Sequence, residues 1–527
     1  MRLLSLATAS ALLVGGVVAS TADAAPAPRP TGSPAADCRA TVAGLDLETA
    51  TVEDLTRAMA AHRLTSQQLV AAYLARIAAY DGPTNAIRAL DPTAMAQAKR
   101  LDAERARGEV RGPLHGVPVL LKDNIGTKDL PTTAGSLALK DLVPYDDAVL
   151  TAKLRAAGAV VLGKTNLSEF ANWVSLTMPN GYSSLGGQVR EAYGLGDPSG
   201  SSSGSGVAGS MAFAAGTFGS ETSGSILSPS SVNGLVGVKP TRGLVSRTGV
   251  IPLAEGFDTA GPMTRNVDDA AALLSAVAGS DKADPATVEA QAHLPAGGDY
   301  TRGLDHASLK GVRLGYSQAD ADALPADSKA LYAEALADLR RLGAVLVPTE
   351  TLDDLGNAGI AETGLIPGDF HANLDHYLQT MAPTPKSGVH SLAEIAVFNQ
   401  QHPDQVKYGQ DLIVASVAAP ASRAAASASA LALRTTSGAT VDAALQQDGL
   451  AAIVGPGPLY ANTGASAGYP TVIVPMGLTT AKRPLGLSFL GTKWDERDLL
   501  TYAAAYEHGT ERRVPPTVVD RALLTGC

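Results

Sequence analysis

The feature that most constrains the fold is the stretch 198–229, PSGSSSGSGVAGSMAFAAGTFGSETSGSILSP. It holds two clusters of serine and glycine on either side of the apolar, almost uncharged segment VAGSMAFAAGTFG. Serine and glycine together are typical of flexible linkers, but a linker would be solvated along its whole length. The apolar segment instead predicts burial, with room for about one helix and one strand. Because glycine permits close backbone approach and serine supplies hydroxyl groups, we expect the two clusters to be two halves of one site.

The first 24 residues predict a secretory signal peptide. Arg2 precedes an apolar run at 3–19, and Ala22-Asp23-Ala24 is a small-x-small cleavage site. We therefore expect a secreted, extracellular protein whose mature N-terminus, 25–40, is disordered. No later segment has about 20 uninterrupted apolar residues, so no membrane partner is expected after cleavage. A net charge of −10 without basic or aromatic clusters argues against nucleic acid as a partner.

The chain contains two cysteines, Cys38 and Cys527. In an oxidising exterior, a pair placed near the two ends predicts a disulfide that ties both termini down. Two inert thiols are the alternative, because the sequence does not show whether their Cα atoms come within bonding distance. Neither cysteine is expected to be catalytic, since neither has a neighbouring histidine or helix start to activate it.

The rest of the chain has the pattern of a sheet covered by helices. Expected helices are two within 51–80 with Thr51 and Thr65 as N-caps, then 93–107, 151–157, one from Leu167, 268–278, 328–342 and 496–508. Expected strands are 117–121, 159–162, 344–347, 451–454, 471–474 and 485–490. Residues 280–437 have the loosest pattern, which is typical of a lid or pocket-forming region.

Lys122 directly follows the predicted strand 117–121. Sheets of α/β proteins place ligands at the carboxyl ends of their strands, and a lysine buried there loses proton affinity and can act as a base. Position alone nevertheless favours a lysine whose ammonium group reaches water. His115 and Lys164 are further polar candidates, for which a structural hydrogen-bonding role is the commoner one. His115 has no partner at ligand spacing, and we predict no metal site.

Two motifs in the central stretch are discounted. GSSSG at 200–204 fits the G-x-S-x-G nucleophile elbow, and GSGVAG at 204–209 fits the G-x-G-x-x-G dinucleotide motif. Both motifs need a buried strand immediately before them, and the preceding REAYGLGDPS cannot form one. What remains is a serine nucleophile without a histidine, for which lysine is the available base.

The motifs PLHGVPVLLKDN, PSGSSSGS, GSETSGSI, VGVKPTRGLVSRTGVIPL and FDTAGPM follow one another between about Leu114 and Arg265. In this order they resemble the amidase-signature hydrolases, and the likeness returns in GASAGYPTVIVPMG and the helix at 496–510. The resemblance implies an α/β amidase-signature fold: a single large domain, 41–527, with a central mixed β-sheet covered by helices on both faces. It also implies a variable substrate-pocket region around 280–437 and an amidase that uses no cofactor and no metal.

The resemblance assigns site residues as well. The family's strand-end lysine falls on Lys122, its bridging serine on Ser201 after a cis peptide bond from Gly200, and its nucleophile on Ser225. The backbone N–H groups of Thr222, Ser223 and Gly224, with that of Ser225, are expected to form the oxyanion hole. Neutral Lys122 is expected to take a proton from Ser201 while Ser201 takes one from Ser225, whose oxygen attacks the amide carbonyl to give an acyl-enzyme.

The spelling PSGSSSGS and the presence of Glu221 resemble the peptide amidases of this family, which remove ammonia from C-terminal peptide amides. Ser223, Leu227 and the segment 190–193 depart from the family's common residues, so a broader aryl or aliphatic amide hydrolase stays open. A tRNA-dependent amidotransferase subunit carries similar motifs but works inside cells, which the signal peptide contradicts. A non-catalytic extracellular binding protein on this fold is the alternative from another class. The expected partner is a small-molecule or peptide amide substrate, and the oligomeric state stays open.

Overall fold

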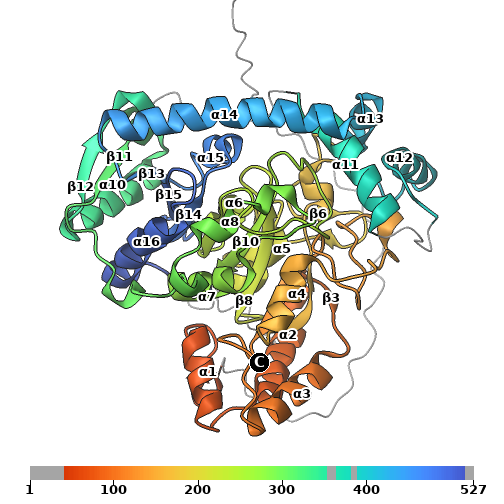
Figure 1. Ribbon diagram of the computed structural model, residues 1–527, viewed down its shortest axis with the longest axis horizontal. Helices are drawn as coiled ribbons and strands as arrows, with labels where there is room; N and C mark the ends of the chain where they lie inside the picture. Colours follow the sequence, from red (N-terminus) through yellow and green to blue (C-terminus); the bar gives the residue numbers. More distant parts are fainter. Residues whose placement is uncertain (1–40, 353–363, 382–387, 517–527) are drawn as a thin grey trace, which may run out of the picture. The chain divides into compact units, whose positions relative to one another are not determined.

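In the computed structural model, the described residues 41–352, 364–381 and 388–516 contain an eleven-stranded mixed β-sheet (Figure 1). Its strands, in spatial order, are β12 (Val345–Pro348), β11 (Arg313–Tyr316), β13 (Ala452–Pro456), β15 (Pro484–Leu490), β14 (Thr471–Leu478), β9 (Val236–Lys239), β10 (Thr259–Thr264), β8 (Gly216–Glu221), β4 (Pro118–Lys122), β5 (Val160–Thr165) and β3 (Ile87–Leu90). β4 is parallel to both β8 and β5, and β11 is parallel to both β12 and β13, whereas the other neighbours are antiparallel.

The apolar composition of the central strands explains their position. Every residue of β4, PVLLK, and of β13, AIVGP, is buried. A strand that is apolar on both faces needs cover on both faces, and helices supply it here. The prediction of a central mixed sheet in an α/β fold is confirmed.

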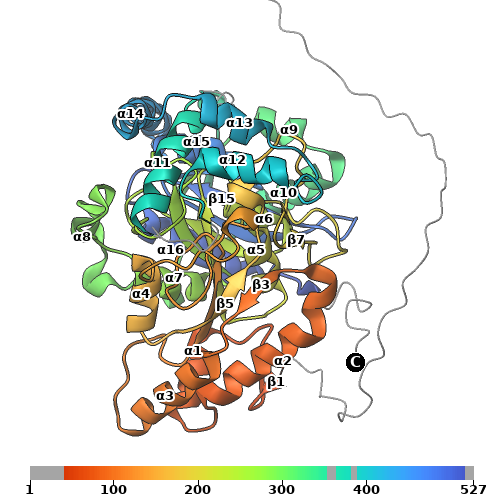
Figure 2. The same ribbon diagram turned by 90° about the vertical axis from the view of Figure 1, so that its right-hand side faces the viewer.

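Sixteen α-helices accompany the sheet within the described ranges. They are α1 (Val52–Ala60), α2 (Ser66–Thr84), α3 (Ala94–Ala106), α4 (Val149–Ala156), α5 (Ser203–Ser210), α6 (Leu227–Val232), α7 (Val267–Val277), α8 (Ala290–His293), α9 (Gln318–Ala323), α10 (Ala326–Arg341), α11 (Ile366–Thr380), α12 (Leu392–Gln401), α13 (Asp411–Ala418), α14 (Arg423–Gln447), α15 (Ala461–Ala467) and α16 (Glu496–Thr510). α5 and α6 pack on one face of the sheet, and α7 and α16 pack on the other (Figure 2). Thr51 and Thr65 cap α1 and α2 with complete capping boxes, as predicted.

The α-helix predicted from Leu167 is wrong. Only a short 3₁₀ turn, Glu169–Asn172, forms there, and Phe170 and Ala171 have φ angles of 46° and 57° in the left-handed region. The segment is instead joined to other parts of the chain: the Ser168 N–H donates to the Ser201 carbonyl at 3.1 Å, and the Phe170 N–H donates to the Ala134 carbonyl. The left-handed conformation of Phe170 and Ala171 excludes the predicted right-handed helix.

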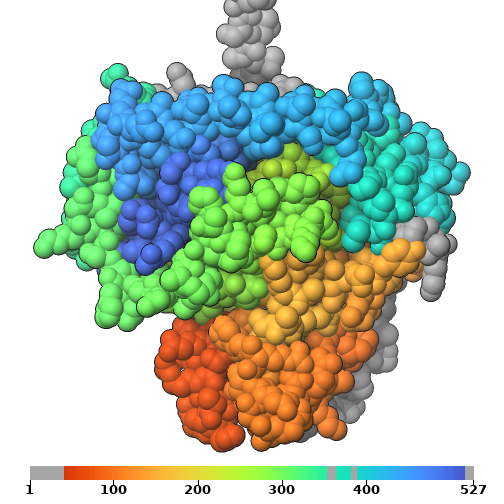
Figure 3. Space-filling view, in the orientation of Figure 1, coloured from red at the N-terminus to blue at the C-terminus, as the bar shows by residue number. Residues whose placement is uncertain are grey.

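The loosely patterned region 280–437 contributes β11, β12 and helices α8 to α14. Helices α11 to α14 share a second hydrophobic core with the segments around Phe170 and Phe257. α14 lies along the surface in the view of Figure 3, where residues 423–447 are blue. Within the described residues, no single helix is long and apolar enough to span a membrane, and α13 with α14 passes that test only as a pair bent by 107°.

Several predictions concern residues outside the described ranges. These are the signal peptide at 1–24, the mature N-terminus at 25–40, and both cysteines of the expected disulfide, Cys38 and Cys527. They stay predictions.

Candidate active site

Lys122 is the last residue of β4, and its side chain is 0% exposed. Its Nζ atom lies 2.8 Å from Ser201 Oγ, 3.0 Å from Ser220 Oγ and 3.2 Å from the Ser220 carbonyl oxygen. The position-based expectation of an ammonium group that reaches water is therefore wrong. The neighbouring strands β8 and β5 and the segment before α5 enclose the end of β4.

Burial changes the acid–base behaviour of this lysine. It lowers the pKa of Lys122 to about 7, although Asp258 and Glu221 favour the ammonium form and oppose the shift. A lysine with this pKa is partly neutral near pH 7 and is able to accept a proton.

Ser201 lies two residues before α5 and is buried. The Gly200–Ser201 peptide bond is cis, as predicted. The next residue, Ser202, donates its backbone N–H to the Ser225 carbonyl at 3.2 Å. The two serine and glycine clusters therefore lie side by side, with Lys122 in direct contact with Ser201.

The apolar segment between the clusters explains how they meet. It forms α5 and then β8, the helix packs on the strand, and both are buried throughout. The Ser202 hydroxyl also donates to the Ser220 carbonyl at 3.0 Å, which joins the start of α5 to the end of β8. The linker interpretation is wrong, and the prediction of a buried helix and strand is confirmed.

Glu221 organises the loop that carries Ser225. Its buried carboxylate accepts hydrogen bonds from the backbone N–H groups of Gly224 at 2.8 Å, Ile226 at 2.7 Å and Leu227 at 3.0 Å. Burial raises the pKa of Glu221, and the buried Lys239 opposes that shift. The sequence interpretation used Glu221 only as a cue to the family and missed this role, for which a single acidic residue beside a loop of small, uncharged residues was the available signal.

The Glu221 carboxylate changes the predicted oxyanion hole. The Gly224 N–H already donates to Glu221, so it is not available to a substrate oxygen in this arrangement. The expectation for Gly224 is corrected accordingly. For the N–H groups of Thr222, Ser223 and Ser225, the oxyanion hole stays a prediction.

Ser220 and Asn124 are site residues that the sequence interpretation did not include. Asn124 Nδ2 donates to Ser220 Oγ at 2.9 Å, and Ser220 in turn contacts Lys122 through two oxygen atoms. Their signal in the sequence was weak: Asn124 follows Lys122 by two residues, and Ser220 is one of many serines in the central stretch.

His115 and Lys164 have the structural roles expected of them. Lys164 Nζ donates to the Ile125 carbonyl at 2.5 Å and to Thr132 Oγ1 at 2.8 Å, and it lies 3.5 Å from Asp123 Oδ1. It therefore holds the loop that follows Lys122. The His115 ring contacts the Leu101 carbonyl at 2.9 Å, before β4 begins. Across the described ranges, no group of three or more His, Cys, Asp or Glu side chains is arranged to hold a metal ion.

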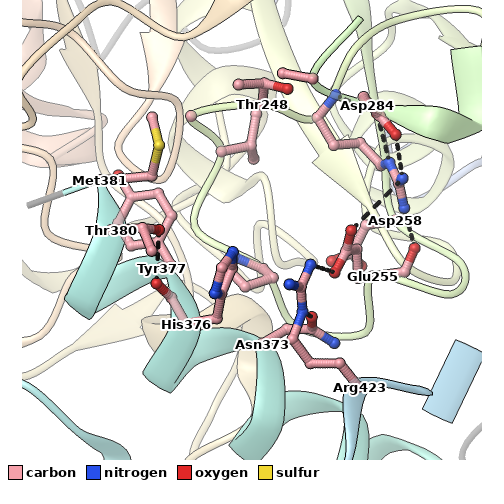
Figure 4. A pocket seen from close by; sticks show the side chains of 15 residues that line it. Thr248, Glu255, Asp258, Asp284, Asn373, His376, Tyr377, Thr380, Met381 and Arg423 are labelled. Carbon is pink, nitrogen blue, oxygen red and sulfur yellow. Dashed lines mark hydrogen bonds and ion pairs between the residues drawn. The ribbon is translucent and has the colours of Figure 1, made fainter. Parts of the chain in front are cut away.

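A cavity of about 250 Å³ lies between the loop 247–258, Asp284 and α11. Figure 4 shows Tyr377 and Met381 of the α11 end on one side and Asp258 and Asp284 on the other. Asp258 accepts a hydrogen bond from Thr222 Oγ1 at 2.5 Å, so the cavity borders the loop that carries Ser225. α11 belongs to the 280–437 region, from which the substrate pocket was expected.

The chain is similar to known amidases over most of its length. The family model described as Amidase matches residues 68–456. The crystal structure of native peptide amidase from Stenotrophomonas maltophilia is 43% identical with a TM-score of 0.82, and the match covers 89% of this chain and 98% of that chain. An amidase family protein from Bacillus anthracis is 36% identical with a TM-score of 0.81, covering 89% and 92%. A probable amidase of Arabidopsis thaliana is 37% identical over 484 residues, 90% of this chain and 92% of that protein.

Proposed function

The chain belongs to the amidase family, and from that premise we propose that it is a serine amidase that removes ammonia from the C-terminal amides of peptides. The observation that carries the proposal is the 2.8 Å contact between the fully buried Lys122 Nζ and Ser201 Oγ, next to the loop of Ser225. The 43% identity to a peptide amidase over almost its whole length supports the choice of substrate.

The proposed mechanism uses Ser225 as nucleophile, Ser201 as proton bridge and Lys122 as base. Neutral Lys122 accepts the Ser201 proton as Ser201 accepts that of Ser225, and Ser225 Oγ bonds to the amide carbon. The backbone N–H groups of Thr222, Ser223 and Ser225 stabilise the oxyanion. The relay then returns a proton to the leaving nitrogen, the C–N bond breaks, and ammonia departs from an acyl ester on Ser225. Water activated by the same relay cleaves the ester and releases the acid.

We place the acyl part of the substrate in the cavity of Figure 4. Its position beside the Thr222–Asp258 hydrogen bond supports this assignment, because a substrate carbonyl at Ser225 would extend toward it. The walls combine apolar groups such as Tyr377 with the charged pair Glu255 and Arg423, 3.2 Å apart. A peptide presents both kinds of surface.

A substrate panel tests the proposal. We expect ammonia release from peptide amides with a higher kcat/KM than amine release from anilides or ammonia release from simple aliphatic amides. A preference for anilides or aliphatic amides would favour the broader amide hydrolase instead. Absence of turnover on every substrate would favour the non-catalytic binding protein.

Ser225→Ala tests the nucleophile. Without the hydroxyl no acyl ester forms, so turnover should fall to background while the melting temperature stays near that of the wild type. Retained turnover in a folded variant would rule out Ser225 as the nucleophile.

A further inference from the structure

Ser220 contributes two of the three oxygen atoms around Lys122 Nζ. Its hydroxyl lies at 3.0 Å and its carbonyl oxygen at 3.2 Å, and Ser201 Oγ at 2.8 Å is the third. Ser220 is the last residue but one of β8, which is hydrogen-bonded to β4, so the sheet sets its distance from Lys122. The proposed relay of protons does not include this residue.

The three oxygen atoms limit how neutral Lys122 can direct its N–H bonds and its lone pair. A neutral amine has two N–H bonds and one lone pair, and a base needs its lone pair directed at the proton that it removes. A carbonyl oxygen only accepts, so one N–H of Lys122 belongs to the Ser220 carbonyl. The second N–H goes either to Ser220 Oγ or to Ser201 Oγ, and the lone pair faces the other hydroxyl. Only the first arrangement lets Lys122 deprotonate Ser201.

We propose that Ser220 is a positioning residue whose hydroxyl and carbonyl oxygens bind the two N–H bonds of neutral Lys122, so that the lone pair faces Ser201. The inference rests on the proposed function, in which Lys122 is the base. After proton transfer, the ammonium group has three N–H bonds, and the same three oxygens accept one each. The lysine therefore gains and loses its proton without moving.

Asn124 donates a hydrogen bond to the Ser220 hydroxyl oxygen and so affects how strongly that oxygen accepts a second one. Its Nδ2 donates to Ser220 Oγ at 2.9 Å and also faces the Ile251 carbonyl at 3.4 Å, which identifies the atom as the NH₂ group because a carbonyl cannot donate. This donation occupies one lone pair of Ser220 Oγ and weakens it as an acceptor for the ammonium form. Asn124 thereby favours the neutral lysine that the relay needs.

The charged groups around Lys122 come from two strands and from two loops. Glu221 on β8 and Asp258 before β10 favour its ammonium form. Asp123, next to Lys122, lies 3.5 Å from Lys164 Nζ on β5, so this pair largely balances itself. A change in the pH profile when Ser220 is replaced by another uncharged residue is therefore a change in the hydrogen bonds to Lys122.

Ser220→Ala is the first test. Loss of the hydroxyl removes one acceptor, so kcat on a neutral peptide amide should fall by about 10- to 100-fold, which is the rate equivalent of one hydrogen bond to a charged group. The acid limb of the kcat profile should move to lower pH, because the ammonium form loses a partner. If the Ser220 proton instead occupied the lysine lone pair, the variant would keep or raise kcat, and the proposal would be wrong.

Asn124→Asp is the second test, and it should move the acid limb in the opposite direction. A carboxylate there favours the ammonium form, so the acid limb should move to higher pH. Because the carboxylate acts on Lys122 through its charge, this variant tests whether Lys122 sets the acid limb. The role of Ser220 is tested by Ser220→Ala: lowered activity with an unmoved limb would indicate a merely structural role and would overturn the proposal. Ser220→Thr, which keeps the hydroxyl, should restore most of kcat and the wild-type limb.

Ser488→Ala is the matched control. Ser488 is a buried strand serine on β15 whose hydroxyl donates to the Gly455 carbonyl at 3.1 Å, with β14, β9 and β10 between it and β8. Its pH profile should match the wild type. Activity in Ser225→Ala would contradict the proposed function, whereas an inactive Ser225→Ala with an unchanged limb in Ser220→Ala would contradict only the role of Ser220.

Discussion

The burial of Lys122 accounts for its proposed role as a base. An exposed lysine is protonated at neutral pH, whereas this one has a pKa of about 7 because it is removed from water. Glu221 and Asp258 limit the shift, so both forms of the amine are accessible near neutral pH.

The pH dependence of the wild-type enzyme follows from this pKa. The base is neutral above about pH 7 and protonated below it, so kcat/KM should fall as the pH drops through about 7. Steady-state rates on an uncharged peptide amide between pH 5 and 9 measure the limb. Lys122→Met should reduce turnover to background at every pH. A Lys122→Met enzyme with a wild-type limb would show that another group is the base.

For single residues, the sequence was a better guide to which residues lie in the site than to what each of them does there. The position of Lys122 after an apolar strand and the resemblance to a family predicted Lys122, Ser201 and Ser225 as site residues, and in the structure Lys122 contacts Ser201. The tasks of Glu221 and Ser220 were not predictable, because each depends on which backbone groups the folded chain brings within hydrogen-bonding distance.

At the scale of elements, the loop 247–258 forms one wall of the cavity and is held by a buried ion pair. Arg247 donates its backbone N–H and its side-chain Nε to Asp284 Oδ2, both at 2.9 Å, and its NH2 group to Oδ1 at 2.5 Å. The side chains are 8% and 3% exposed. The Glu255 carbonyl accepts further hydrogen bonds from Arg242 and Arg247. The loop therefore has few alternatives to its observed path.

Asp284→Asn should destabilise the protein. Breaking one partner of a buried ion pair costs about 3–5 kcal/mol, because the other charge stays buried without compensation. The free energy of unfolding from urea titration measures the loss, and KM should rise as the cavity wall loosens. Asp322→Asn, which removes an exposed partner of Lys329, is the control and should leave stability unchanged.

The same ion pair predicts how the stability of the protein changes as the pH falls. Burial opposes ionisation of Asp284, but the hydrogen bonds from Arg247 outweigh it and lower the pKa of Asp284 below the ordinary 3.8. Its stabilisation is complete above pH 3.8 and is lost as the pH falls through the lower folded value. Asp284→Asn should lack this component of acid unfolding, and an unchanged acid profile would contradict the role of the pair.

At the scale of the whole molecule, one sheet assembles the site from distant parts of the chain. Lys122 comes from β4 and Ser220 from the adjacent β8, and they meet across 98 positions of sequence. The core that shapes the cavity draws on α11 to α14, more than 100 residues further on.

Export is a prediction for the whole molecule. We propose that the leader is removed after Ala24, that the mature chain is secreted, and that Cys38 and Cys527 form a disulfide. N-terminal sequencing of the exported protein should begin at Ala25, and intact-mass analysis after alkylation without reductant should detect no free thiol. A product that keeps Met1 would contradict removal of the leader, and a product with two alkylated thiols would contradict the disulfide.

Local pattern was sufficient for the elements whose apolar residues are continuous or periodic. The strands β4, β13 and β14 and the capped helices α1 and α2 follow from burial and capping preferences within a few residues. The helix expected from Leu167 does not form, because Phe170 and Ala171 have left-handed φ angles that a right-handed helix excludes. The pKa of Lys122 and the direction of its lone pair depend on burial and on contacts with distant segments. The same is true of which backbone N–H groups stay free to bind a substrate oxygen. Only the tertiary structure decides those quantities, because the order of residues along the chain does not show which distant oxygen atoms will contact the Lys122 amine.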